Sequence, residues 1–102
     1  MFKTISPQDL QSKINAKENI HLIDVREPHE HAEFNIGGIL LPLGKIQTMQ
    51  IDDIEDLKME EVILYCRSGV RSSQAAMILQ QLGFTNVTNL TGGALAWQEL
   101  IK

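Results

Sequence analysis

The sequence has a single cysteine, no excess of positive charge and no long apolar run. One cysteine in 102 residues excludes an intramolecular disulfide and suits a reducing compartment. The formal net charge of -4 argues against a nucleic-acid-binding surface, which would be basic. No run is long and apolar enough to span a bilayer, and residues 1–9 lack the apolar core of a secretory signal. We therefore expect a cytoplasmic protein with neither nucleic acid nor a membrane as partner.

The composition suits one compact domain over residues 1–102. Hydrophobic residues make up 43% of the chain and charged residues 22%, which is ordinary for a globular protein. No repeat, low-complexity tract or Pro/Gly/Ser-rich linker divides the sequence. We therefore expect a single domain with one core.

Segments typical of strands alternate with segments typical of helices. Strands are expected at residues 2–5, 20–25, briefly before Pro42, at 61–65 and at 86–90. Helices are expected from Ser6-Pro7 onward, at 28–34, within 44–57, at 72–82 and after Gly92-Gly93. This alternation favours an α/β fold, in which helices cover both faces of a mostly parallel sheet. Right-handed crossovers place several strand ends on the same rim of such a sheet.

Three of these helices carry local signals. Ser6 is a suitable N-cap, and Pro7 suits the first helical position. Gly83 is expected to end the helix at 72–82. Within 44–57, apolar residues such as Met49 suggest a helix whose outer face is acidic.

The only cysteine, Cys66, lies where the apolar strand at 61–65 runs into a short polar loop and then a helix. Ligands of open α/β sheets usually bind at the carboxyl ends of the strands. The first turn of a helix stabilises an anion, and Arg67 and Arg71 flank the thiol. These influences favour the thiolate, which is the nucleophilic form. A buried core cysteine is the alternative, but a core strand does not require two arginines directly after it. We predict that Cys66 is a catalytic cysteine.

The loop from Cys66 to Arg71 can curl around the sulfur with its backbone N–H groups pointing inward, which forms a nest for an anion. Gly69 supplies the backbone freedom that such a curl needs. Arg71 can offer a planar fork to an oxyanion, and Arg67 can attract an anionic substrate. A thiolate in this bowl can attack an atom that leaves with an anionic group and can hold the resulting intermediate. No histidine lies near the loop in sequence, which weighs against a protease-type Cys–His pair.

Asp24 and Arg26 follow another strand and are expected at the same rim as Cys66. We assign them a supporting role, as an ion pair or as a loop anchor at the strand end.

Two histidines, His29 and His31, lie close to Glu30 and Glu33. A spacing of two places the histidines on different sides of a helix, and no further ligand cluster is evident. We predict a solvated helix face here and no metal site.

Three segments together resemble the single-domain rhodanese-like sulfurtransferases. They are Cys66-Arg-Ser-Gly-Val-Arg-Ser72, Leu22-Ile-Asp-Val-Arg-Glu27 and Leu90-Thr-Gly-Gly-Ala-Leu-Ala-Trp97. The segments occur in the family's order at suitable spacing, and the resemblance covers nearly the whole chain. It implies a three-layer α/β/α fold with a central, mainly parallel, five-stranded sheet. It implies no metal or organic cofactor.

The resemblance also implies an activity. Cys66 would accept a sulfane sulfur from a small anionic donor such as thiosulfate, or from a persulfide, and become a persulfide. The sulfur would then pass to cyanide, a thiol or a protein acceptor. Arg71 would close the loop and Arg67 would meet the anionic end of the donor. The loop amides would hold the persulfide; the residues concerned are Arg67, Ser68, Gly69, Val70, Arg71 and Ser72.

Other functions are compatible with this fold. Related dual-specificity phosphatases and arsenate reductases have five residues between the cysteine and the arginine, and this chain has four between Cys66 and Arg71. The shorter loop favours sulfur transfer. A persulfide carrier or sensing module without turnover is the other alternative. The chain departs from the family's Gly-His-Ile-Pro-Gly-Ala pattern at residues 34–39, and we assign no role to Asn35.

Overall fold

The computed structural model describes residues 2–102 and contains one five-stranded sheet. Its strands are β1 (Lys3–Ile5), β2 (His21–Asp24), β3 (Ile39–Leu40), β4 (Glu61–Tyr65) and β5 (Asn86–Leu90). Their order across the sheet is β1-β5-β4-β2-β3, and every neighbouring pair is parallel. The α/β fold with a parallel five-stranded sheet, expected from the alternation and the family resemblance, is confirmed.

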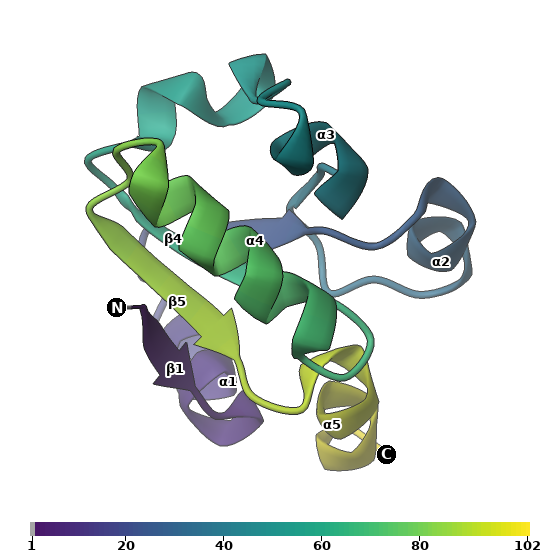
Figure 1. Ribbon diagram of the computed structural model, residues 1–102. Helices are drawn as coiled ribbons and strands as arrows, with labels where there is room; N and C mark the ends of the chain where they lie inside the picture. The colour runs from purple at the N-terminus through teal and green to yellow at the C-terminus, as the bar shows by residue number, and fades with distance from the viewer. Residues whose placement is uncertain (1) are drawn as a thin grey trace.

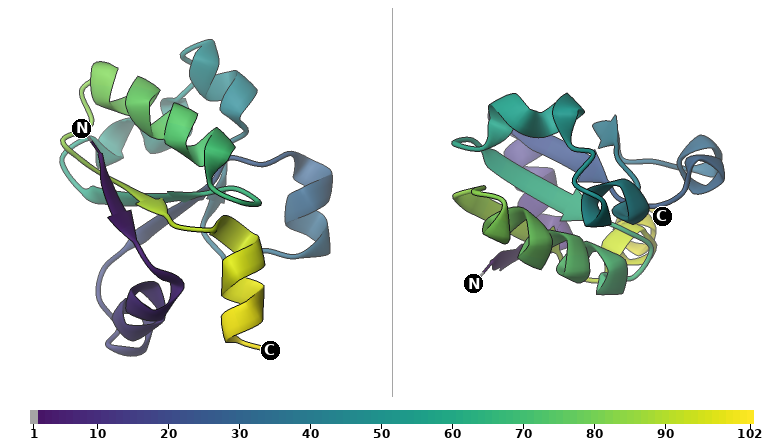
Figure 2. Two further views of the ribbon diagram at one scale, coloured as in Figure 1. Left: turned by 60° about the horizontal axis from the view of Figure 1, so that its bottom comes forward. Right: turned by 45° about the horizontal axis from the view of Figure 1, so that its top comes forward.

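Helices cover both faces of the sheet and complete three layers (Figure 1, Figure 2). They are α1 (Pro7–Asn15), α2 (Pro28–Glu33), α3 (Leu43–Gln47), the 3-10 helix η1 (Asp52–Leu57), α4 (Val70–Gln81) and α5 (Gly93–Leu100). Helices α3 and α4 and η1 lie on one face, α1 and α5 lie on the other, and α2 stands to one side. Between residues 2 and 102, no helix combines the length and the apolar character needed to cross a bilayer.

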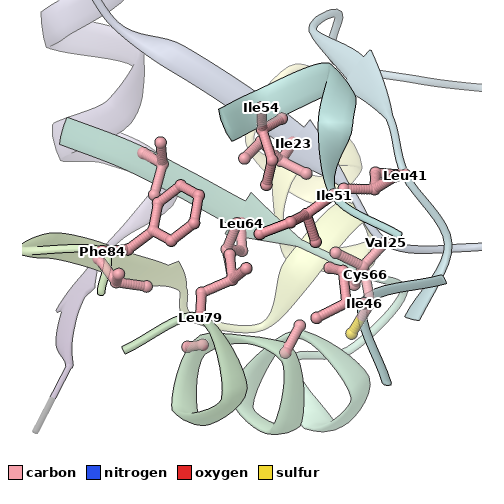
Figure 3. Packing of buried hydrophobic residues seen from close by; sticks show 14 residues of the cluster. Ile23, Val25, Leu41, Ile46, Ile51, Ile54, Leu64, Cys66, Leu79 and Phe84 are labelled. Atoms are coloured by element: carbon pink, nitrogen blue, oxygen red, sulfur yellow. The ribbon is translucent and has the colours of Figure 1, made fainter. Parts of the chain in front are cut away.

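The central strand β4 explains why the core has two parts. Its side chains alternate, so that Val62 and Leu64 pack under α3, η1 and α4, whereas Ile63 and Tyr65 pack against α1 and α5. A parallel strand that is buried on both faces carries a continuous apolar run, as β4 does from Val62 to Tyr65. Cys66 belongs to the first part of the core, together with Ile46 (Figure 3).

The local helix signals work as expected. The Asp9 N–H donates a 3.0 Å hydrogen bond to Oγ of Ser6, so Ser6 is the N-cap of α1. Gly83 follows the end of α4 with φ of 101°, a backbone conformation that favours glycine. Helix α4 begins at Val70, two residues earlier than the sequence suggested, so its first turn is part of the cysteine loop.

The segment 44–57 differs from the expectation of one helix. The chain forms α3 and η1 as separate short helices, and Met49 between them has a positive φ of 61°. Oγ1 of Thr48 donates to the carbonyl oxygen of Gly44, a side-chain bond that competes with continued helix. The Met49 side chain is 67% exposed, and Ile51 fills the core instead.

Candidate active site

The sulfur lies at the rim where two neighbouring strands end. Strands β2 and β4 are paired so that Asp24 lies opposite Tyr65, the residue before Cys66. The N–H of Val25 donates to the Tyr65 carbonyl oxygen at 3.0 Å, which keeps the two chains together just past the sheet. Asp24, Arg26 and Cys66 therefore lie at one rim, as their positions at the ends of two strands predict.

The cysteine loop curls around its own sulfur. The N–H of Gly69 points at Sγ of Cys66 from 3.0 Å, and the N–H of Ser72 points at it from 3.4 Å. Gly69 is the N-cap of α4 and has φ of 109°, so any other residue there would be strained. The loop and the first turn of α4 thus form a bowl of N–H groups with the sulfur at its base.

The thiol of Cys66 is 1% exposed, and two opposing influences act on it. Burial raises the pKa of the Cys66 thiol, because a charged sulfur loses its contact with water. The hydroxyl of Ser72 and the N–H groups of Ser72, Gly69 and Ser68 lower the pKa by stabilising the thiolate. The effect of the hydrogen bonds exceeds that of burial, so the pKa of Cys66 lies below its ordinary value. The bowl therefore favours the nucleophilic form of the sulfur.

The start of α5 supports the outside of the loop. The N–H of Ala94 donates to the Cys66 carbonyl oxygen at 2.8 Å, and the N–H of Leu95 donates to the Arg67 carbonyl oxygen at 3.0 Å. A Cβ at Gly93 would lie 2.6 Å from the Arg67 carbonyl oxygen, so only glycine allows this close approach. Sequence reasoning assigned Gly93 to the family motif but not to the site, because nothing local reveals what the turn packs against.

Arg71 does not point a free guanidinium at the bowl. Its two terminal nitrogens donate to the two carboxylate oxygens of Glu30 at 2.7 and 2.9 Å. Arg71, through this pairing, holds the pKa of the Glu30 carboxyl at about 2. The positive charge of Arg71 still acts on Cys66, since the two groups interact electrostatically. The expectation that Glu30 lies on a solvated helix face is wrong, because the chain brings α2 against the start of α4.

Asp24 and Arg26 form the ion pair considered from the sequence. Nε and Nη2 of Arg26 donate to the two oxygens of Asp24 at 2.9 and 2.8 Å, and both side chains are buried. Nη2 of Arg26 also donates to the Phe34 carbonyl oxygen, and the guanidinium lies over the Tyr65 ring. Nδ1 of His31 lies 2.8 Å from Oδ2 of Asp24. The expectation that His31 lies on a solvated helix face is therefore also wrong. These contacts anchor α2 to the rim.

Asn35 closes the end of α2 in the segment that departs from the family pattern. Its amide nitrogen donates to the His31 carbonyl oxygen at 3.0 Å, and its amide oxygen accepts the Gly37 N–H at 2.9 Å. The Tyr65 hydroxyl accepts from the Ile36 N–H and donates to the Gly37 carbonyl oxygen. This segment is therefore held by local hydrogen bonds despite its unusual residues.

The remaining loop residues lie on the surface. Ser68 is exposed, and the Val70 side chain is 67% exposed, so these two contribute backbone to the loop. Arg67 is exposed and forms no ion pair within residues 2–102. It lines a cleft of about 450 Å³ between α2 and α5, whose walls include Glu33 and Leu95. Arg67 is thus placed to meet an anion that approaches from solvent.

The structure adds Asn89 to the site, a residue that sequence reasoning did not single out. Asn89 lies in β5, is 6% exposed, and contacts the start of α4 through its side-chain amide. The strand at 86–90 also contains Asn86 and Thr88, so no local signal in the sequence distinguishes Asn89. No group of three or more His, Cys, Asp or Glu side chains is arranged to hold a metal ion within residues 2–102.

The chain belongs to the rhodanese-like domain family, whose sequence model matches residues 6–100. It is similar to a sulfurtransferase of Allochromatium vinosum, with 37% identity over 95% of this chain and 89% of the relative. The human single-domain sulfurtransferase TSTD1 has a similar structure, with a TM-score of 0.80, 25% identity and 97% of each chain covered. A rhodanese-like domain protein of Staphylococcus aureus has a TM-score of 0.82 and 27% identity, and the match covers 94% of this chain and 91% of that one. The resemblance stated from the three sequence motifs is confirmed.

Proposed function

We propose that this protein is a sulfurtransferase that moves a sulfane sulfur through a persulfide on Cys66. The observation that carries the proposal is the sulfur at the base of a bowl of N–H groups, with four residues between Cys66 and Arg71. The kinship with sulfurtransferases over nearly the whole chain supports it. The proposal requires no metal or organic cofactor.

The first half of the reaction loads the cysteine. The Cys66 thiolate attacks the outer sulfur of thiosulfate, the S–S bond of the donor breaks, and sulfite leaves with the bonding electron pair. The product is a Cys66 persulfide whose outer sulfur carries the negative charge. The N–H groups of Gly69 and Ser72 point at Sγ of Cys66, and in this proposal the outer sulfur lies in the same bowl, where N–H groups can stabilise its charge.

The second half unloads it. A thiophilic acceptor, either cyanide or a thiolate, attacks the outer sulfur, and the S–S bond to Cys66 breaks. The acceptor leaves as thiocyanate or as a new persulfide, and the Cys66 thiolate is restored. The lowered pKa of Cys66 supports this step, because a more stable thiolate is a better leaving group.

Arg67 and Arg71 take different roles in this proposal. Arg67, which has no ion pair within residues 2–102, attracts the anionic end of the donor. Arg71 has its fork occupied by Glu30, so it positions the loop and supplies charge at a distance. This division replaces the expectation that Arg71 offers its fork to the substrate.

The test is thiocyanate formation from thiosulfate and cyanide, in the natural protein and in Cys66→Ser. We expect activity in the natural protein, none in the variant, and a mass increase of one sulfur on Cys66 after incubation with thiosulfate. Loading without turnover would favour the carrier alternative. No activity and no added sulfur would overturn the proposal for thiosulfate, and hydrolysis of an aryl phosphate would then be measured to test the phosphatase alternative.

A further inference from the structure

Asn89 is a buried amide whose hydrogen-bonding groups all meet the start of α4. Its Oδ1 accepts from the Ser72 hydroxyl at 2.5 Å, and its Nδ2 donates to Oγ of Ser73 at 2.8 Å and to the Gly69 carbonyl oxygen at 3.3 Å. A carbonyl oxygen can only accept, so Nδ2 must face Gly69, and Oδ1 must then face Ser72. The orientation of the amide is therefore fixed by its neighbours.

Ser72 has one hydroxyl proton and three acceptors within reach. The Asn89 oxygen lies 2.5 Å from Oγ, the Gly69 carbonyl oxygen 3.2 Å, and Sγ of Cys66 3.4 Å. Only one of the three can receive a well-aligned hydrogen bond at a time. Since Asn89 is the nearest acceptor, it competes for this proton and weakens the hydrogen bond by which the Ser72 hydroxyl stabilises the thiolate.

We propose that Asn89 competes with the Cys66 sulfur for the single hydroxyl proton of Ser72, and is thereby a positioning residue that sets the reactivity of the nucleophile. While Asn89 holds the proton, the sulfur keeps only the backbone N–H groups of the bowl as donors. The inference rests on Cys66 being the nucleophile of the proposed function.

Without the Asn89 amide, the Ser72 proton would move to the sulfur. The alternative acceptor, the Gly69 carbonyl oxygen, already receives the N–H of Ser73 at 3.1 Å and the Ser73 hydroxyl at 2.7 Å. Its two lone pairs are therefore occupied. A thiolate is also the stronger acceptor, because hydrogen bonds to charged groups are stronger than those between neutral groups. Removing the amide should make the thiol easier to ionise.

The pH dependence of Cys66 alkylation by iodoacetamide, followed by intact mass, measures this directly. Cys66 is the only cysteine, so each added mass reports on it alone. In Asn89→Leu, which keeps the branching and the number of heavy atoms of the side chain, we expect the half-maximal rate at a pH about one unit lower. A profile that is unchanged or shifted upward in a folded Asn89→Leu protein would overturn the inference.

A double-mutant cycle separates this role from general support of the loop. Ser72→Ala should raise the pH of half-maximal alkylation by clearly less than one unit in the natural background, and by about one unit in the Asn89→Leu background. An equal rise in both backgrounds would mean that the Ser72 proton already serves the sulfur, and would overturn the inference. If Asn89→Leu does not fold, Ser72→Ala alone decides. A rise of about one unit in its pH of half-maximal alkylation would also overturn the inference.

Asn86 provides the matched control at the other end of β5. Its Oδ1 has no hydrogen-bond partner within residues 2–102, and Asn86→Leu should leave the alkylation profile unchanged. A shift in Asn86→Leu equal to that in Asn89→Leu would show a general effect of the strand and would count against the inference. Alkylation needs no sulfur donor, so a failure of this inference is distinguishable from a failure of the proposed sulfur transfer.

Discussion

Arg71 and Glu30 form a two-pronged ion pair that joins the start of α4 to α2, across 41 positions of the sequence. The pair lies beside the bowl, and its side chains are 34% and 20% exposed. It occupies the guanidinium of one of the two arginines of the cysteine loop and fixes α2 at the rim. The loop and α2 are therefore expected to respond together to changes in either residue.

The stability that the Arg71–Glu30 pair contributes should depend on pH. The folded state holds the pKa of Glu30 at about 2, against an ordinary 4.5. Its contribution is therefore complete above about pH 4.5 and is lost as the pH falls toward 2, because the unfolded chain takes up the proton first. We expect Glu30→Gln to lower the free energy of unfolding by about 1 kcal/mol at neutral pH, after allowance for solvent screening. Urea denaturation across this pH range should show the difference between the two proteins disappear.

Glu33→Gln is the control for the acid dependence. Glu33 lies on the same helix, is exposed and forms no ion pair within residues 2–102. If Glu33→Gln lowered the free energy of unfolding with the same pH dependence as Glu30→Gln, the effect would belong to overall charge and not to the pair with Arg71.

Gly93 should not tolerate even one methyl group. The added Cβ of Gly93→Ala would press on the carbonyl oxygens of Cys66 and Arg67, and the backbone has φ of 60°. We expect a loss of about 2 kcal/mol in the free energy of unfolding and a loss of Cys66 reactivity. Gly44→Ala is the matched control, because its Cβ meets nothing within 4 Å and lies in helix α3. Gly44→Ala should be neutral or stabilising by up to about 1 kcal/mol. Equal losses of stability in the two variants would contradict the close packing of Gly93 against the cysteine loop.

Arg67 should act on the donor and not on the fold. We expect Arg67→Glu to raise KM for thiosulfate at least about fivefold, since one charge close to an anion in water is worth about 1 kcal/mol. Added salt should shrink the difference. Lys102→Glu makes the same charge change at the exposed end of the chain and should leave KM unchanged. An equal rise in KM for both variants would indicate net charge and not a local role of Arg67.

Asp24→Asn should be strongly destabilising. Asp24 is fully buried, and burial alone would raise the pKa of its carboxyl. Hydrogen bonds from Arg26 and His31 outweigh burial and hold this pKa below its ordinary value. The amide would leave the buried Arg26 charge uncompensated, at a cost of about 3 kcal/mol in the free energy of unfolding. Asp52→Asn changes an exposed carboxylate and should have almost no effect. Equal denaturation midpoints for the two variants would show that the ion pair contributes little.

The parts of the site that could be predicted are those encoded within a few neighbouring residues. The strand at 61–65, the glycine at 69 and the following helix lie together in sequence, so the bowl around Cys66 follows from local signals. Parallel pairing then brings Asp24 to the same rim, because the carboxyl ends of parallel strands lie at the same edge of the sheet.

The parts that could not be predicted depend on side-chain pairs distant in sequence. Nothing near Glu30 indicates that Arg71 will be its partner, and nothing near Asn89 indicates that Ser72 lies against it. The helix periodicity around Met49 was misleading because a local side-chain bond and a positive φ interrupt it. Periodicity reports which residues are apolar, not whether the backbone between them is continuous.

The support of the cysteine loop by α5 has a consequence for the order in which the protein matures. The N–H groups of Ala94 and Leu95 hold the loop from outside, and they come after all five strands in the chain. On the ribosome, the sheet and the cysteine are therefore synthesised before the segment that fixes the loop. A nascent chain that lacks α5 would carry the sulfur without its full set of supports, so the nucleophile acquires its final environment only after α5 has been synthesised.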